Sequence, residues 1–231
     1  MRRPRGWKLW GGLAVAGVIL LGIAGPYVYI HYIEGDPPAP LDARATSSPL
    51  PVVGTVEGTW SVASGSQAGY RVKEVLAGQQ ATAVGRTDKV TGSLTVAGAT
   101  VTKASFDVDL ASVSSDQGRR DDSFRGPIMQ TDRFPIATFV LASPVALGAL
   151  ATTGGTQQLI VSGRLTLHGV TKEVTFPLAV VRSGATVTAS GQVPVVFADY
   201  RVANPSIGGF VTTDDKGVVE VLLHFTKVTV S

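Results

Sequence analysis

The chain has 231 residues, of which 44% are hydrophobic and 16% are charged, and it contains no cysteine. This composition argues against a disordered chain, and the lack of cysteine excludes disulfides, thiolate catalysis, cysteine-bound zinc and a lipidated N-terminal cysteine. The formal net charge of +3 reflects basic residues within the first eight positions, so it predicts no nucleic-acid-binding surface.

The first predicted element is a transmembrane anchor over residues 9–33. This stretch contains no Asp, Glu, Lys or Arg, and as a helix rising ~1.5 Å per residue it would reach ~37 Å, enough to cross a bilayer. A basic segment, residues 1–8, precedes it, and the next basic residue is Arg44. This asymmetry predicts a single-pass protein of the cell membrane with a cytoplasmic N-terminus and an extracytoplasmic domain. The alternative is a cleaved signal peptide with a weak site at residues 22–24.

Residues 34–55 are rich in proline and carry no regular alternation of hydrophobic and polar residues. Such a composition is typical of an extended, semi-rigid spacer. We therefore expect a Pro-rich linker that does not pack and that holds the following domain, residues 56–231, away from the membrane.

Residues 56–231 are predicted to form one all-β domain. Hydrophobic and polar residues alternate in short stretches, which is the pattern of strands with one buried face. His168-Gly169 between two such stretches predicts a tight hairpin turn. About eight or nine strands joined mostly by short turns indicate an up-and-down antiparallel sheet, either closed as a barrel or packed as a sandwich. The expected strands cover residues 60–62, 70–76, 90–96, 104–110, 136–143, 159–168, 171–182, 186–197 and 218–230.

Residues 115–134 interrupt this alternation with many charges and with Phe124, Ile128 and Met129 at near-helical spacing. A short helical excursion, interrupted at Gly126-Pro127, fits this stretch best.

Catalytic and metal-binding patterns are weak in this sequence. The chain has three histidines, and His168 and His224 share the polar side of their strands, so we interpret both as surface residues. The sequence contains no Gly-x-Ser-x-Gly motif. We therefore expect no metal site, no cofactor and no serine-hydrolase chemistry.

Three motifs, in order, resemble the YceI-like family. Gly58–Val62 is similar to the family's opening Gly-x-Trp-x-Val. Arg120–Arg125, followed by Phe134–Phe139, resembles its Arg-Asp-x-His-Leu-Arg block and the aromatic-Pro-x-x-x-Phe continuation, and Gly163–Lys172 resembles its Gly-x-Leu-Thr-x-x-Gly-x-Thr-Lys hairpin. Ser123 departs from the pattern, because the family usually has histidine there. The resemblance extends from about residue 57 to residue 230.

The resemblance implies a lipocalin-like antiparallel β-barrel of about eight strands that encloses a polyisoprenoid or similar long apolar chain in the bacterial cell envelope. The expected function is carriage, sequestration or sensing of an isoprenoid-type lipid or quinone. From the strand alternation we expect inward-facing residues to contact this ligand, with Arg120 at its polar end. The predicted contacts are Phe106, Val108, Leu110, Phe139, Leu141, Val161, Leu165, Leu167, Val174, Phe176, Leu178, Leu223, Phe225 and Arg120.

Arg120 and its charged neighbours allow two interpretations. The favoured one is an ion-paired helix that covers one end of the barrel. In the other, Arg120 and Asp121 lie at the barrel mouth, where Arg120 would hold a phosphate or quinone oxygen. Two other functions therefore stay open: an enzyme that acts on such a lipid, and a filled, ligand-free domain that binds protein partners.

Overall fold

The computed structural model describes residues 36–45, 50–76, 78–206 and 211–228. The expected transmembrane anchor lies outside the described residues. Within those ranges, no helix is both long and apolar enough to cross a membrane.

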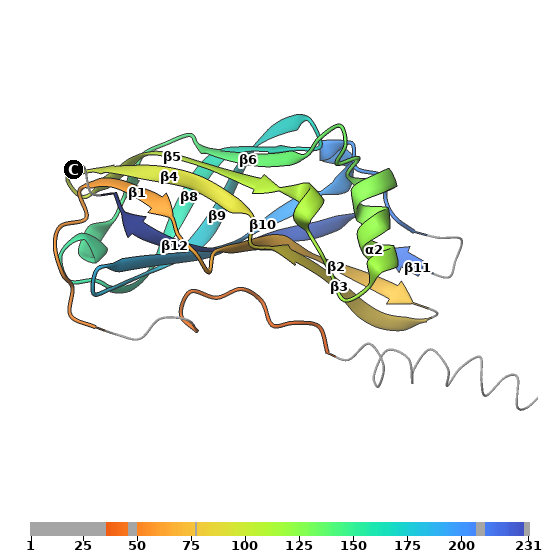
Figure 1. The fold of residues 1–231 in the computed structure, drawn as a ribbon, viewed down its shortest axis with the longest axis horizontal. Helices are drawn as coiled ribbons and strands as arrows, with labels where there is room; N and C mark the ends of the chain where they lie inside the picture. The colour runs from red at the N-terminus through yellow and green to blue at the C-terminus, as the bar shows by residue number, and fades with distance from the viewer. Residues whose placement is uncertain (1–35, 46–49, 77, 207–210, 229–231) are drawn as a thin grey trace, which may run out of the picture.

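Eight antiparallel strands form a closed barrel (Figure 1). Strands adjacent in the barrel are mostly adjacent in sequence, and the pairing of the first with the last closes the wall, with Val62 opposite Phe225. The predicted β-barrel is thus confirmed, and the sandwich alternative is wrong. Around the barrel the strands are β1 (Gly58–Val62), β4 (Val90–Ala97), β5 (Thr100–Asp109), β6 (Ile136–Leu141), β8 (Gly155–Leu167), β9 (Val170–Ser183), β10 (Thr186–Val196) and β12 (Lys216–Lys227).

A hairpin extends the wall at one end of the barrel. β2 (Gln67–Leu76) follows β1 and pairs with the first half of β12, while β3 (Gln79–Thr87) pairs with β2. Two short strands, β7 (Val145–Ala146) on β5 and β11 (Val211–Thr213) on β2, complete the sheet. The sequence did not predict β3, because that strand carries mostly Ala, Gly, Gln and Thr instead of alternating large hydrophobic residues.

Short helical turns cover both ends of the barrel. The end beside the β2–β3 hairpin, here called the helix end, carries η2 (Leu110–Ser112), α2 (Gly118–Ser123), the π-helical turn η3 (Phe124–Ile128) and η5 (Phe197–Tyr200). The opposite end, here called the packed end, carries η4 (Gly148–Ala151) and the β9–β10 turn. The expected interruption at Gly126-Pro127 is wrong, because the π-helical turn runs through both residues and the Met129 amide donates to the Phe124 carbonyl at 2.9 Å.

Within the described residues, the expectation that the spacer does not pack is also wrong. Residues 36–45 and 50–56, here called the strap, run along the outside of the barrel (Figure 1). Ala43 is completely buried, and its amide donates to Ser190 Oγ on β10 at 2.9 Å. Further along, the Leu50 amide donates to Ser183 Oγ at 2.9 Å. The strap packs because the outer face of the barrel offers polar acceptors and a small apolar surface around Val181.

The strap also covers an ionic cluster on the outer face. Glu220 of β12 is completely buried, and its carboxylate lies 3.4 Å from Arg71 Nε and 2.7 Å from Arg86 Nη2. The same two guanidinium groups donate to the main-chain carbonyls of Pro38 and Ala39 in the strap. The strap thus contacts β2 and β3 near its start and the β9–β10 turn near its end.

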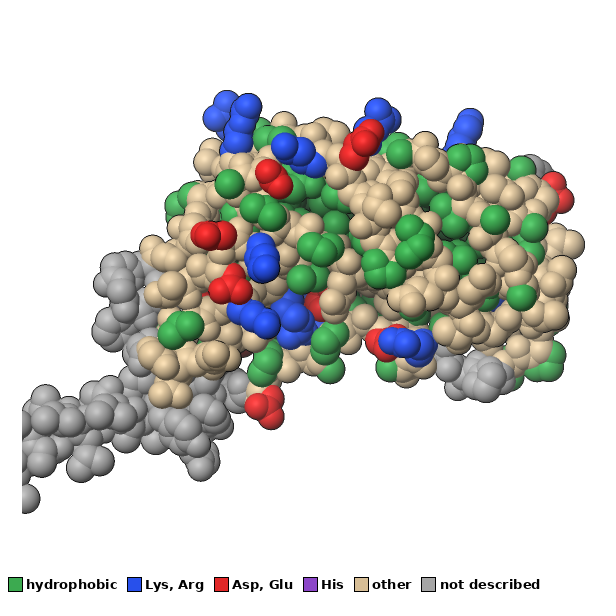
Figure 2. Space-filling model, turned by 180° about the vertical axis from the view of Figure 1, so that it is seen from behind, with side chains coloured by type: hydrophobic (Ala, Val, Ile, Leu, Met, Phe, Trp, Pro, Cys, Tyr) green, Lys and Arg blue, Asp and Glu red, His purple; other side chains and the backbone are tan. Residues whose placement is uncertain are grey.

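One face of the molecule is mixed in charge. On the face opposite to that of Figure 1, basic and acidic side chains are interspersed, with hydrophobic side chains between them (Figure 2). This distribution matches the near balance of 20 basic and 17 acidic residues in the whole chain.

Candidate functional site

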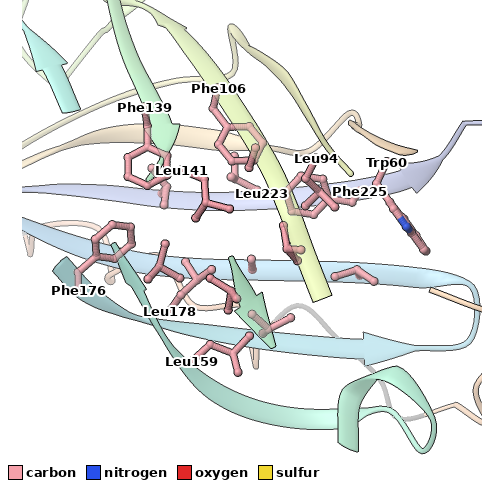
Figure 3. Close-up of a pocket in the computed structure, with 18 of the residues that line it drawn as sticks. Trp60, Leu94, Phe106, Phe139, Leu141, Leu159, Phe176, Leu178, Leu223 and Phe225 are labelled. Atoms are coloured by element: carbon pink, nitrogen blue, oxygen red, sulfur yellow. The ribbon is translucent and has the colours of Figure 1, made fainter. Parts of the chain in front are cut away.

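The barrel interior contains an apolar inner chamber of about 170 Å³ toward the packed end. Its walls are the inward-facing side chains of the barrel strands (Figure 3). An apolar cavity of roughly 150 Å³ in another protein stays dry and takes up a benzene-sized molecule. The inner chamber is therefore suited to a short hydrocarbon segment. The labelled lining residues are Trp60, Leu94, Phe106, Phe139, Leu141, Leu159, Phe176, Leu178, Leu223 and Phe225.

Glycines explain why large rings leave this space empty. A Cβ on Gly92 would lie 2.7 Å from a ring carbon of Phe106, and a Cβ on Gly163 would lie 2.2 Å from a ring carbon of Phe139. Each ring therefore rests against the wall, over a glycine of a neighbouring strand, instead of reaching across the lumen. This arrangement lines the barrel with aromatic surface and preserves the cavity.

The packed end is closed by the strap and by Arg182. The Arg182 guanidinium donates to the carbonyls of Leu150 at 3.0 Å, Ala151 at 2.7 Å and Gly54 at 2.6 Å. Burial lowers the pKa of Arg182. Val56 of the strap is buried and lines the inner chamber beside these groups. Arg182 thus joins η4 to the strap.

A larger outer chamber of about 700 Å³ lies toward the helix end. It is bounded by β2, β3, β11, the ends of β5, β8, β10 and β12, and the helical segment α2–η3. Four residues line both chambers: Val108, Ala137, Leu165 and Val219. The two chambers therefore adjoin, and a flexible hydrocarbon chain could extend from one into the other.

The outer chamber differs from the inner one in carrying polar side chains. Arg120 Nη2 lies 3.3 Å from Glu74 Oε1, and its Nη1 pairs with Asp116 one turn earlier on the chain. Thr213 also lines this chamber and is only 6% exposed, and its hydroxyl has no hydrogen-bond partner among the described residues. The polar groups lie at the helix end, whereas the four residues shared with the inner chamber are apolar.

Tyr70 also lines the outer chamber. Its ring stacks on Phe124 with centroids 5.0 Å apart, and a Cβ on Gly85 would come within 2.4 Å of the ring. Burial raises the pKa of Tyr70 to about 12, with Arg120 opposing the shift and nearby carboxylates adding to it. The phenol is therefore neutral at ordinary pH.

The structure brings nearly all of the predicted contact residues to the two chambers. Thirteen of the fourteen line one or both, whereas Val174 packs in the core without lining either. Their contact with a ligand stays a prediction. Phe106, Phe139, Leu141, Val161, Phe176, Leu178, Leu223 and Phe225 line the inner chamber, Leu110, Leu167 and Arg120 the outer chamber, and Val108 and Leu165 both.

Polar or amphipathic residues of the outer chamber that the sequence did not predict include Tyr70, Glu74, Gln117 and Thr213. One signal was available, since Glu74 alternates in phase with Tyr70, Val72 and Leu76 and thus occupies an inward-facing position of β2. Thr213 gave no signal, because its three-residue strand is too short for a periodic pattern.

The surface interpretation of His168 is wrong. Its side chain is only 7% exposed, and its ring packs edge-on against Phe134 with centroids 4.7 Å apart. His168 and Gly169 form the predicted hairpin turn, with φ of 50° and 73°. In this left-handed conformation the His168 ring packs against Phe134 instead of facing solvent. Nδ1 lies 3.2 Å from the Tyr200 carbonyl. No group of three or more potential metal ligands occurs among the described residues.

Comparisons with known proteins agree with this geometry. The family model of the YceI-like domain matches residues 60–225. A solved polyisoprenoid binding domain from Saccharophagus degradans, implicated in plant cell wall breakdown, aligns with a TM-score of 0.62 at 20% identity, covering 74% of this chain and 100% of that one. BcnA from Burkholderia cenocepacia aligns with a TM-score of 0.51 at 23% identity, covering 67% and 95%. No curated protein matches the sequence significantly.

Proposed function

This chain belongs to the YceI-like domain family, and on that premise we propose that its barrel binds the hydrocarbon chain of an isoprenoid-type lipid or quinone. The observation that carries this proposal is the pair of adjoining chambers of about 170 and 700 Å³ inside a closed barrel. Pockets of ~300–1,000 Å³ with mainly apolar walls are typical of small-molecule sites. The polyisoprenoid binding of the relative from Saccharophagus degradans supports the same class of ligand.

The free energy available from such a ligand is sufficient. Each buried CH₂ contributes ~0.8 kcal/mol, so several isoprene units contribute on the order of 10 kcal/mol before the cost of association. Because the inner chamber is lined by hydrocarbon side chains, this gain requires no charged anchor at the end of the tail. The affinity should then depend on the length of the tail and on the junction between the chambers. This junction, here called the passage, is lined by Val108, Ala137, Leu165 and Val219.

The proposal includes a location. The uncharged segment 9–33 between basic residues and the strap supports a single-pass anchor, with the barrel on the extracytoplasmic side of the cell membrane. There the barrel would carry, sequester or sense its lipid close to the bilayer.

Binding is better supported than catalysis. Arg120 is engaged by Glu74 and Asp116, while Asp121 accepts hydrogen bonds from the Ser115 amide at 2.8 Å and from its hydroxyl at 2.7 Å. These contacts favour the ion-paired helix over an acid–base pair poised at a substrate. A filled, ligand-free domain would have no internal cavity, so the two chambers argue against that alternative.

The test uses the full chain in detergent and quinones whose isoprenoid tails increase in length. Native mass spectrometry with organic extraction identifies any co-purified lipid, and equilibrium titration gives the affinity for each tail. We expect the affinity to rise with tail length until both chambers are filled. A chain that contains no lipid and takes up none of these quinones would contradict the proposal.

Ala137→Phe tests the passage, because Ala137 is buried and lines both chambers. We expect short-tailed quinones to bind as before and long-tailed ones to bind at least ~tenfold more weakly, the equivalent of about two buried methylenes. Ala142→Phe, at an exposed position after β6, is the matched control. Retained binding of the short tails shows that the variant is folded.

A further inference from the structure

We propose that the helix end of the barrel selects a neutral, hydrogen-bonding head group, such as a carbonyl or hydroxyl, and excludes a phosphate or diphosphate. This inference rests on the proposed binding of an isoprenoid tail, which brings the head group to the outer chamber. The residues around Arg120 decide the selection, because they form the polar part of this chamber.

The charges at the outer chamber are already balanced. Arg119 and Arg120 are the lining cations among the described residues, Glu74 is the lining carboxylate, and Asp116, two residues before α2, pairs with Arg120. The Glu74 and Arg120 side chains are only 13% and 17% exposed, so their charges depend on each other for compensation. The cluster therefore presents no net positive charge to a ligand.

An anionic head group would upset this balance. A phosphate carries about −1.5 to −2 charges at neutral pH, and to reach Arg120 it would have to displace Glu74. The displaced carboxylate would then lie in a largely buried chamber, beside the incoming anion and without its partner, which is strongly unfavourable. Arg119 offers little compensation, because its side chain is exposed and well hydrated.

A neutral head group meets complementary partners instead. The Thr213 hydroxyl is buried without a partner among the described residues, and a buried hydroxyl gains from either donating or accepting a hydrogen bond. Thr213 is held in place, since its amide donates to Ser206 Oγ at 3.0 Å and its carbonyl accepts from Asn204 Nδ2 at 3.1 Å. It lies directly opposite Glu74 in the β11–β2 pairing. An uncharged oxygen there can bond to Thr213 without disturbing the Glu74–Arg120 pair.

The test compares two ligands with the same tail, geranylgeraniol and geranylgeranyl diphosphate, by equilibrium titration of the full chain in detergent. We expect the alcohol to bind at least ~tenfold more tightly. If the diphosphate binds as tightly or more tightly, the head-group inference is overturned while tail binding stands. If neither ligand binds, the proposed lipid function fails, and this inference with it.

Two variants separate the roles of charge and hydroxyl. Glu74→Gln removes the competing carboxylate, so the preference for the alcohol over the diphosphate should fall by about tenfold. The control Glu173→Gln, at an exposed residue of β9, should leave this preference unchanged.

Thr213→Val removes the buried hydroxyl and should weaken alcohol binding by about fivefold, whereas the control Thr212→Val, at an exposed residue, should not. An unchanged preference in Glu74→Gln, or unchanged alcohol affinity in Thr213→Val, would contradict the assigned role of that residue.

Discussion

The two ends of the barrel are stabilised in opposite ways. At the packed end, buried interior side chains stabilise the barrel around a small chamber: Leu150 is only 2% exposed, Trp60 belongs to the same core, and Arg182 binds main-chain carbonyls. At the helix end the interior is a chamber of about 700 Å³, and the most deeply buried group of the wall, Glu220, lies on its outer face.

This difference between the two ends indicates how a barrel can remain stable around a large cavity. Side chains that face an empty chamber have few atoms to contact, so they contribute less dispersion energy than those of a filled core. Around the outer chamber, the wall gains contacts from outside, through the Glu220 ion pairs with Arg71 and Arg86 and through the strap. The outer face of these strands therefore provides stabilising contacts, while their inner face lines the cavity.

The largest expected effect is the truncation of a side chain in the packed end. Leu150→Ala should lower the free energy of unfolding by about 4 kcal/mol, because it removes an almost completely buried side chain and enlarges the small, tightly lined inner chamber. Leu76→Ala, which enlarges the existing outer chamber, should cost only about 1 kcal/mol. Urea denaturation measures both values. Equal losses would show that the two ends do not differ in packing.

The next effect concerns the outer face. Glu220→Gln leaves Arg71 and Arg86 without their carboxylate in a part-buried site, so the free energy of unfolding should fall by about 3 kcal/mol. Glu173→Gln makes the same chemical change at an exposed position and should shift stability by less than about 0.5 kcal/mol. If the two variants are equally stable, the outer ion pairs do not support the wall.

The smallest expected effect is a pH dependence at the helix end. The pKa of Tyr70 is raised to about 12, above its ordinary value of 10.0, so its stabilising contribution is complete below pH ~10 and is lost as the pH rises toward 12. The difference in tyrosinate absorbance between the wild type and Tyr70→Phe follows this titration. A midpoint near the ordinary value would mean that the chamber around Tyr70 is well hydrated.

Several elements were predictable because their information is local. The alternation over residues 104–110 places Phe106 and Val108 inward, as the structure shows in β5. His168-Gly169 indicated the β8–β9 turn, where both residues have positive φ. Period-two alternation and turn preferences act over a few residues, so a single sequence is enough to detect them.

Other features could not be predicted because distant segments create them. Glu220 alternates in phase with the polar side of β12, and nothing near it in sequence indicates that Arg71, Arg86 and the strap bury it. The proline-rich composition of the strap gave no sign that Ala43 would be completely buried. Burial of an outer face depends on which remote segment covers it, and that is a property of the tertiary structure.

By itself, the sequence determined the all-β class, most of the strands and the side of each strand that turns inward, because backbone alternation and turn chemistry are encoded residue by residue. Only the tertiary structure decided that the sheet closes around two adjoining chambers, that the Phe106 ring occupies the space that Gly92 leaves open, and that Arg120 is paired with Glu74. Cavity shape and charge balance depend on contacts between strands far apart in the chain, which are fixed only when the barrel closes.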